Sequence, residues 1–157
     1  MAVKKDQKTN FLKDVSLFDG LEDKVLARIF KLGKVKNFSK GEVIIREGGE
    51  GGNLHIMIEG TAEVSLKKAA NDRSRYLADL ARGSVFGEMS VFDDAPYSAT
   101  VKAREDCSVH VIKGEDFKKF LQKNPEDAYE IFSALIKQTS SRLRHTNLAF
   151  SLLGFDS

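Results

Sequence analysis

A Gly-Glu pair at residues 87 and 88 is the part of the chain whose residue types and spacing best suit chemistry. We expect a short helical turn to begin there, followed by a loop containing Pro96 and a small alternating strand that ends at Val101. Backbone N–H groups at the start of such a turn point outward, and the helix dipole favours an anion there. Residues 86–101 therefore predict a site for a small anionic ligand.

Catalytic chemistry has less support in the sequence. Glu88 has no second acid at a telling position, and no Ser-His-Asp or Cys-His arrangement stands out. The histidines His55, His110 and His145 lie far apart, whereas a metal-dependent jelly-roll enzyme needs clustered ligands. His55 and His110 alternate out of the apolar face of their strands, which predicts solvated or satisfied side chains. We therefore expect no catalytic residue, no metal site and no cofactor.

Two other features also favour structural roles. The cluster from Gly48 to Gly52 lacks the lysine and the Ser/Thr of a phosphate-binding P-loop, so we interpret it as a flexible hairpin turn. Cys107 alternates with Val109 and Val111, which predicts a small core side chain. A single cysteine forms no internal disulfide, in agreement with a reducing compartment.

The composition is that of one compact domain. The chain has 157 residues, 31% of them charged and 41% hydrophobic, in the range of soluble globular proteins. No apolar run has the length of a membrane span, and the polar, lysine-rich start does not read as a signal peptide, so we predict a cytoplasmic protein without a membrane partner. A formal net charge of +2 gives no strong hint of nucleic acid.

The elements that would position residues 86–101 fall into three parts. Apolar residues at helical spacing predict a helical part over 8–33. Period-two patterns over 54–59, 62–67 and 98–103, separated by glycine turns, predict antiparallel strands with one buried face over 35–113. Helices follow over 114–150, and Asn124-Pro125-Glu126-Asp127 marks the start of a helix that runs to about Phe150. The predicted fold is α+β, with a jelly roll as one way to close the strands.

The stretch 86–101 resembles the phosphate-binding cassette of cyclic-nucleotide-binding domains, of the catabolite-activator and protein-kinase regulatory-subunit type. That family pattern runs F-G-E-hydrophobic-small-hydrophobic, a loop, and P-R-small-small-T-V. Other phrases are similar to the family in order and spacing, namely Gly41–Gly48, Ile56–Gly60, Gly83–Glu88 and Arg142–Phe150. The resemblance covers residues 11–150 and implies a single domain over 1–157 with an antiparallel β jelly roll (double-stranded β-helix), N-terminal helices and a long C-terminal helix.

The resemblance also implies roles for individual residues. Backbone N–H groups of the cassette would surround a cyclic phosphate, and Glu88 would accept a hydrogen bond from the ribose hydroxyl. Thr146 and Asn147 fall where bacterial relatives place polar residues that cap the base. The implied ligand-binding residues are Phe86, Gly87, Glu88, Met89, Ser90, Pro96, Tyr97, Ser98 and Ala99.

Tyr97 departs from the pattern, because the family places there the arginine that grips the cyclic phosphate. A tyrosine offers one neutral hydroxyl in place of a charged fork of donors, and the loss would weaken an anionic ligand by roughly two to four powers of ten. Three readings stay open: a cyclic nucleotide bound weakly or with a replacement cation, another ligand stacked on Tyr97, or an empty pocket. The cations nearest in sequence are Arg73, Arg75 and Arg82.

The resulting functional hypothesis is a regulatory module without catalysis. It would bind cAMP, cGMP or a related small ligand in the jelly roll and signal to an unknown protein partner through the C-terminal helices. The alternatives are a degenerate, non-binding scaffold and the effector-binding fragment of a transcription regulator. Residues 151–157 are too few for a winged helix-turn-helix, so this chain would carry no DNA-binding domain. Homodimerisation through the C-terminal helix is a further hypothesis.

Overall fold

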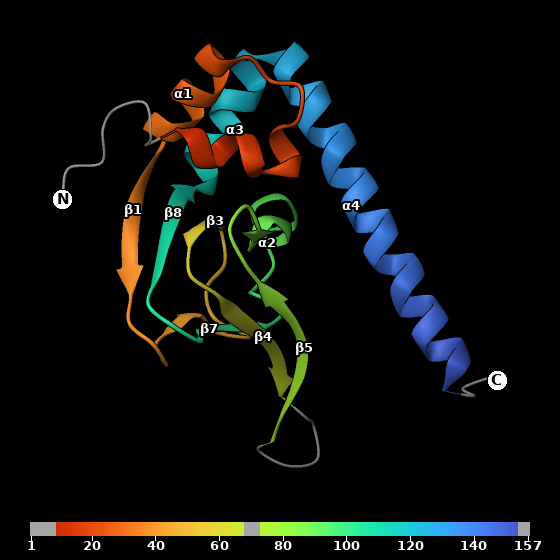
Figure 1. The fold of residues 1–157 in the computed structure, drawn as a ribbon. Helices are drawn as coiled ribbons and strands as arrows, with labels where there is room; N and C mark the ends of the chain where they lie inside the picture. The colour runs from red at the N-terminus through yellow and green to blue at the C-terminus, as the bar shows by residue number, and fades with distance from the viewer. Residues whose placement is uncertain (1–8, 68–72, 154–157) are drawn as a thin grey trace.

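The protein, described here by a computed structural model of residues 9–67 and 73–153, places most of its helices on one side of a jelly roll (Figure 1). Residues 1–8, 68–72 and 154–157, which the predicted domain over 1–157 includes, lie outside the described residues. The helical elements are η1 (Asn10–Asp14), η2 (Ser16–Phe18), α1 (Asp23–Lys31), α2 (Glu88–Asp93), α3 (Gly114–Lys123) and α4 (Pro125–Leu152). The strands are β1 (Gly33–Phe38), β2 (Val43–Ile45), β3 (Asn53–Glu59), β4 (Ala62–Lys67), β5 (Ser74–Leu80), β6 (Val85–Phe86), β7 (Thr100–Ala103) and β8 (Cys107–Lys113).

The strands form two antiparallel sheets of four. One sheet has the order β1-β8-β3-β6 and the other the order β2-β7-β4-β5. Neighbours in space are mostly distant in sequence: β1 pairs with β8 from Gly33 opposite Ile112 to Phe38 opposite Cys107. These long-range pairings confirm the predicted α+β jelly roll.

The β1-β8-β3-β6 sheet is the middle of three layers, which corrects the expectation of one buried face. Along β3, Leu54 and Ile56 join a cluster with the helices, while Met57 joins a second cluster with the other sheet. Since alternate residues of a strand point to opposite faces, both faces of β3 are covered. His55 and His110 are therefore buried, at 5% and 0% exposure, so of the two predicted alternatives, solvated or satisfied, the solvated one is wrong. Nε2 of His110 lies 3.0 Å from the Phe30 carbonyl oxygen.

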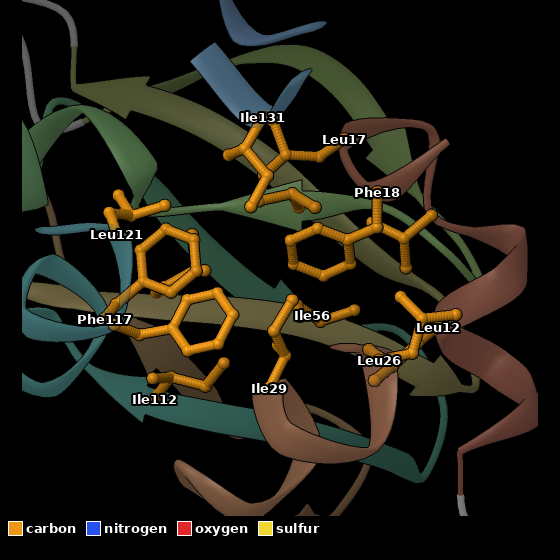
Figure 2. Close-up of a cluster of buried hydrophobic side chains, with 14 of the residues drawn as sticks. Leu12, Leu17, Phe18, Leu26, Ile29, Ile56, Ile112, Phe117, Leu121 and Ile131 are labelled. Carbon is orange, nitrogen blue, oxygen red and sulfur yellow. The ribbon is translucent and has the colours of Figure 1, made fainter. Parts of the chain in front are cut away.

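The first of these clusters, called here the helical cluster, ties the helices to the sheet. Figure 2 shows side chains from η1, η2, α1, α3 and α4 gathered over Ile56 and Ile112 of the sheet. Phe117, Ile29 and Ile131 in this cluster have no exposed surface. Burying side chains of this size contributes about 1.5–3 kcal/mol each.

The long helix α4 begins at Pro125, after Asn124, and ends at Leu152, close to the predicted span. The Asn124 side chain does not cap α4: its Nδ2 donates to the Phe120 carbonyl at the end of α3, and its Oδ1 accepts from Arg28. The first turns of α4 bury Ala128 and Ile131. From residue 141 onward every described residue of α4 is exposed, and the helix extends away from the jelly roll (Figure 1).

Within residues 9–67 and 73–153, no helix has the length and apolar character needed to cross a membrane.

Candidate functional site

Residues 86–101, called here the cassette, form one wall of a cavity of about 360 Å³. The opposite walls come from β2, β4 and β5 of the second sheet and from α4. All nine residues proposed from the sequence as ligand-binding line this cavity; the further lining residues are Ile45, Val64, Leu77, Ala78, Leu80, Val85, Asp93, Ala95, Val101 and Arg142. Most of this lining is apolar, as is usual for a small-molecule site, while the binding role of each residue stays a prediction.

Gly87 sets the direction in which the cassette leaves β6. Its φ of 74° lies in the left-handed region that favours glycine. A Cβ at this position would lie 2.7 Å from the Asn53 carbonyl oxygen and 3.1 Å from Cε1 of Tyr97. Only glycine fits both the backbone conformation and the space, so the residue before Glu88 is fixed by geometry.

The glycine cluster over 48–52 holds the cassette in place. The Gly48 N–H donates to the Tyr97 carbonyl (2.8 Å), and the Tyr97 N–H donates to the Gly49 carbonyl (3.1 Å). The Ser90 hydroxyl accepts from the Gly52 N–H and donates to the Gly87 carbonyl. A Cβ on Gly51 would lie 2.5 Å from Cβ of Ser90. The predicted hairpin turn is thus a close-packed support of the cassette.

Glu88 is a buried carboxylate in the cavity. It is 5% exposed, and its Oε1 accepts a 2.6 Å hydrogen bond from Nη1 of Arg142 on α4. Among the described residues that line the cavity, Arg142 is the one cation. A buried carboxylate needs such a partner, because an unpaired charge away from water is costly.

The sequence analysis did not assign a role to Arg142, although the residue opens the Arg142–Phe150 stretch. The signal that could have found it is the spacing Arg142 to Thr146, one helical turn, which places an arginine on the same face as the predicted base cap. The cations considered instead do not line the cavity: Arg82 pairs with Asp14 (2.7 Å), and Arg73 and Arg75 are exposed.

Thr146 and Asn147, the predicted base cap, are exposed on α4 and do not line the cavity. The Thr146 hydroxyl donates to the Arg142 carbonyl of its own helix (2.9 Å). Their proposed contact with a base therefore requires α4 to approach the cassette.

Tyr97 lines the cavity and also packs into the second cluster, called here the inter-sheet cluster. It is 8% exposed, and its ring meets His55 edge-on at 5.9 Å between centroids. Burial raises the pKa of the Tyr97 phenol, against a smaller opposing effect of Asn53. The hydroxyl is thus a neutral group, which cannot supply the positive charge of an arginine.

His55 lies behind the cassette in a similar apolar setting. Its ring stacks on Phe86 at 5.0 Å, and its Nδ1 is buried without a hydrogen-bond partner among the described residues. Burial lowers its pKa to about 4, despite an opposing effect of the Asn53 and Phe86 backbone. His55 is therefore neutral at pH 7.

The described part of the chain offers no candidate site for metal binding or for a reactive thiol. Within it, no three His, Cys, Asp or Glu side chains lie close enough to hold a metal ion. Cys107 is 3% exposed and its Sγ donates to the Thr61 carbonyl, as expected of a core side chain. Burial raises the pKa of this thiol, which disfavours the reactive thiolate.

Comparison with known proteins points to one family. A family model described as cyclic nucleotide-binding domain matches residues 35–124. The chain is 34% identical over 113 residues to cGMP-dependent protein kinase 2 of Homo sapiens, covering 71% of this chain and 15% of that protein. It is 37% identical over 105 residues to the cAMP-dependent protein kinase regulatory subunit of Mycosarcoma maydis, covering 65% of this chain and 20% of the relative.

A solved structure agrees with this result. The catabolite activator protein of Thermus thermophilus superposes with a TM-score of 0.79 at 26% identity, over 89% of this chain and 63% of that one. The curated relatives are several times longer than the matched region, so the match concerns one domain of each.

Proposed function

The chain belongs to the cyclic nucleotide-binding domain family, and from this premise we propose that it senses a cyclic nucleoside monophosphate, cAMP or cGMP, in the cassette cavity. The proposed sensor acts in the cytoplasm, performs no catalysis and passes the signal to a protein partner through α3 and α4. Support comes from the match to regulatory domains and from a cavity of suitable size beside the cassette.

The ion pair between Glu88 and Arg142 is the observation that carries the proposal. Glu88 belongs to the cassette and Arg142 to α4, so a ligand that alters this pair acts on the terminal helix directly. A ribose hydroxyl donating to Glu88 would compete with Arg142, and a phosphate would attract the released guanidinium. Arg142 is thus our candidate for the cation that replaces the missing cassette arginine.

A second contact couples the same two elements. Phe92 of α2 meets Phe117 of α3 and Phe132 of α4 edge-on, with ring centroids 6.4 Å and 5.4 Å away. Rings packed this way resist independent movement, because each would leave a gap in a close-packed layer. A shift of α2 on ligand entry would therefore displace α3 and α4 as well.

A non-binding scaffold is the second candidate, and one observation favours it. Tyr97 occupies the position where the family places its phosphate-binding arginine, and its ring packs among apolar neighbours. In that case the cassette would keep its shape through the Gly48–Gly52 support without holding a ligand.

Calorimetric titration of cAMP and cGMP separates the two candidates, with 5′-AMP as the acyclic control. We expect one cyclic nucleotide to bind with micromolar affinity, and 5′-AMP to bind more weakly by a factor of about ten or more. Arg142→Gln should weaken binding by about one to two powers of ten, because it removes the charge that faces the phosphate. Arg144→Gln, a change of the same kind two residues along the exposed helix, is the matched control. Absence of binding to both cyclic nucleotides would support the scaffold.

The distal part of α4 supports a second copy of this chain as partner. Apolar residues recur at heptad spacing at Tyr129, Phe132, Ile136, Leu143, Phe150 and Leu153, with threonines at the two intervening positions 139 and 146. Most of this stripe is exposed: Ile136 by 65% and Leu143 by 59%. A helix without packing is marginal in water, whereas a heptad stripe is buried by pairing with another helix. Light scattering should give a dimer mass for the native chain and a monomer mass for Leu143→Glu; a native monomer would refute the pairing.

A further inference from the structure

A surface hollow of about 480 Å³ is lined by residues of α1 and α3, which lie among the helices on one side of the jelly roll (Figure 1). It is lined by Arg28, Lys31, Leu32, Asp116, Lys119, Phe120, Lys123 and Asn124, and is called here the basic hollow. It shares no lining residue with the cassette cavity. The sequence analysis did not single it out, because its cations come from two segments about ninety residues apart.

The charges of the basic hollow are unbalanced. Four cations face one carboxylate, that of Asp116. Within residues 9–67 and 73–153, the other lysines and arginines that form ion pairs do so elsewhere, and no ion pair includes Arg28, Lys31, Lys119 or Lys123. The hollow therefore concentrates positive charge on a chain whose net charge is only +2.

The spacing of these cations works against the stability of the helices. Lys119 and Lys123 are four residues apart on α3, and Arg28 and Lys31 are three apart on α1. Like charges at this spacing lie on one helix face and repel. The helix dipole favours Arg28, Lys31 and Lys123, which lie in the last turns of their helices, and Asp116, three residues before Lys119, offsets part of the repulsion on α3. Neither effect accounts for the convergence of all four cations on one hollow.

Arg28 is already held in position. Its Nη2 donates to Oδ1 of Asn124 (2.6 Å), and its guanidinium lies over the Phe120 ring at 5.2 Å. Asn124, which also lines the hollow, joins α3 to α4, so the hollow borders the joint between these two helices. An occupant of the hollow would contact that joint.

These observations narrow the chemistry of the occupant. A compact phosphate site draws on backbone N–H groups at helix N-termini, whereas the four cations of this hollow lie in the C-terminal halves of α1 and α3, and part of the Arg28 fork is engaged. Single-stranded nucleic acid needs accessible aromatic rings, yet Phe120 is 6% exposed and covered by Arg28. Separate lysine ammonium groups around an open hollow match separate carboxylates on a peptide.

We propose that the basic hollow docks an acidic peptide segment of a partner protein, at the joint between α3 and α4. The proposal is independent of the ligand in the cassette cavity.

Fluorescence anisotropy with a labelled peptide of alternating Asp and Glu tests the proposal at low salt. The hollow variant carries Lys31→Gln, Lys119→Gln and Lys123→Gln. The matched control carries Lys36→Gln, Lys40→Gln and Lys102→Gln, three exposed lysines outside the hollow with the same loss of charge. Circular dichroism of both variants shows that they are folded.

We expect the native chain and the control to bind the peptide with affinities within about twofold of each other. The affinity of the hollow variant should be lower by a factor of about ten or more. Equal weakening by both variants would overturn the proposal, since binding would then follow net charge alone. Absence of peptide binding to the native chain would overturn it as well. Tighter binding of a single-stranded DNA of equal charge, lost in the hollow variant, would assign the hollow to nucleic acid instead.

Discussion

The two faces of the β1-β8-β3-β6 sheet are covered by side-chain layers with different roles. The helical cluster on one face is apolar and closed, with Phe11, Phe117 and Ile131 fully or almost fully buried. The inter-sheet cluster on the other face is smaller, includes Tyr97 and borders the cassette cavity. One sheet thus separates a layer that stabilises the fold from a layer that leaves room for a ligand.

This difference shows that residues adjacent in the chain can have different roles in the protein. Ile56 and Met57 are neighbours in β3, have the same zero exposure and contribute to opposite layers. A strand covered on both faces lets one residue stabilise the fold while the next shapes the wall behind the site. Substitutions in the two layers test this contrast.

Alanine at each of these two neighbours gives the most direct comparison. We expect Ile56→Ala to lower the free energy of unfolding by about 4 kcal/mol and Met57→Ala by about 2 kcal/mol, because the layer beside a cavity can relax around the lost side chain more easily. Urea unfolding measures both values. Equal losses would show that the two layers are packed equally tightly, which would contradict the proposed difference between them.

Acid should destabilise the protein through His55. Its folded pKa of about 4 is below its ordinary value of 6.5, so the unfolded chain takes up a proton at higher pH than the folded one. The associated stability is fully present above about pH 6.5 and is lost as the pH falls through about 4, in total roughly 3 kcal/mol. Burial also lowers the pKa of His110, which acts in the same direction from the helical side.

Unfolding measured against pH, with His55→Phe as the variant, isolates the share of the inter-sheet layer. The phenyl ring preserves stacking on Phe86 and removes the proton, so the variant should lose less stability between pH 6.5 and 4. His145→Gln, at an exposed position on α4, should retain the native pH dependence. An unchanged profile in His55→Phe would assign the acid effect to other groups.

We expect Tyr97→Arg to lower the stability of the protein and to raise its affinity for the ligand. Placing a guanidinium among apolar neighbours should lower the free energy of unfolding by about 2 kcal/mol, while binding of a cyclic nucleotide improves about tenfold or more. Thermal unfolding and calorimetry measure the two effects. Tyr97→Phe, which keeps the ring and lacks the hydroxyl, controls for packing. A variant that is destabilised without any gain in affinity would show that this position does not face the phosphate.

Arg142→Gln should have the smallest effect on stability. Its guanidinium side chain is 57% exposed, so solvent screens the pair, and we expect a loss of about 1 kcal/mol from the unpaired Glu88. Glu88→Gln in the same background should restore most of this loss, because it removes the buried charge. A loss as large as that of Ile56→Ala would make the pair a structural element rather than a binding one.

Local patterns predicted the elements well. Asn124-Pro125 marked the start of α4, and alternating residues over 54–58 marked β3, because a proline in the first helical turn and a period-two pattern act over a few residues. The faces were predicted less well: the strands were expected to have one buried face, with His55 and His110 solvated or satisfied outside it, since an alternating pattern does not say how many faces of a sheet are covered.

The cassette wall was predicted because residues 86–99 are contiguous and resemble a family pattern in their glycine, acid and proline positions. The cation opposite Glu88 was not, since Arg142 lies fifty-four residues away and reaches the cavity only through the packing of α4 against η2 and α3. The supporting contact between Gly51 and Ser90 was missed for the same reason.

Near-neighbour patterns in the sequence predicted the helices, the alternating strands β3, β4 and β7 and the turn that begins at Glu88, while the nine cassette residues came from the resemblance to a family pattern. The tertiary structure alone decided the second buried face of the middle sheet, the Glu88–Arg142 pair and the basic hollow between α1 and α3. These features depend on which distant segments meet, and that choice is set by the burial of whole layers rather than by any local pattern.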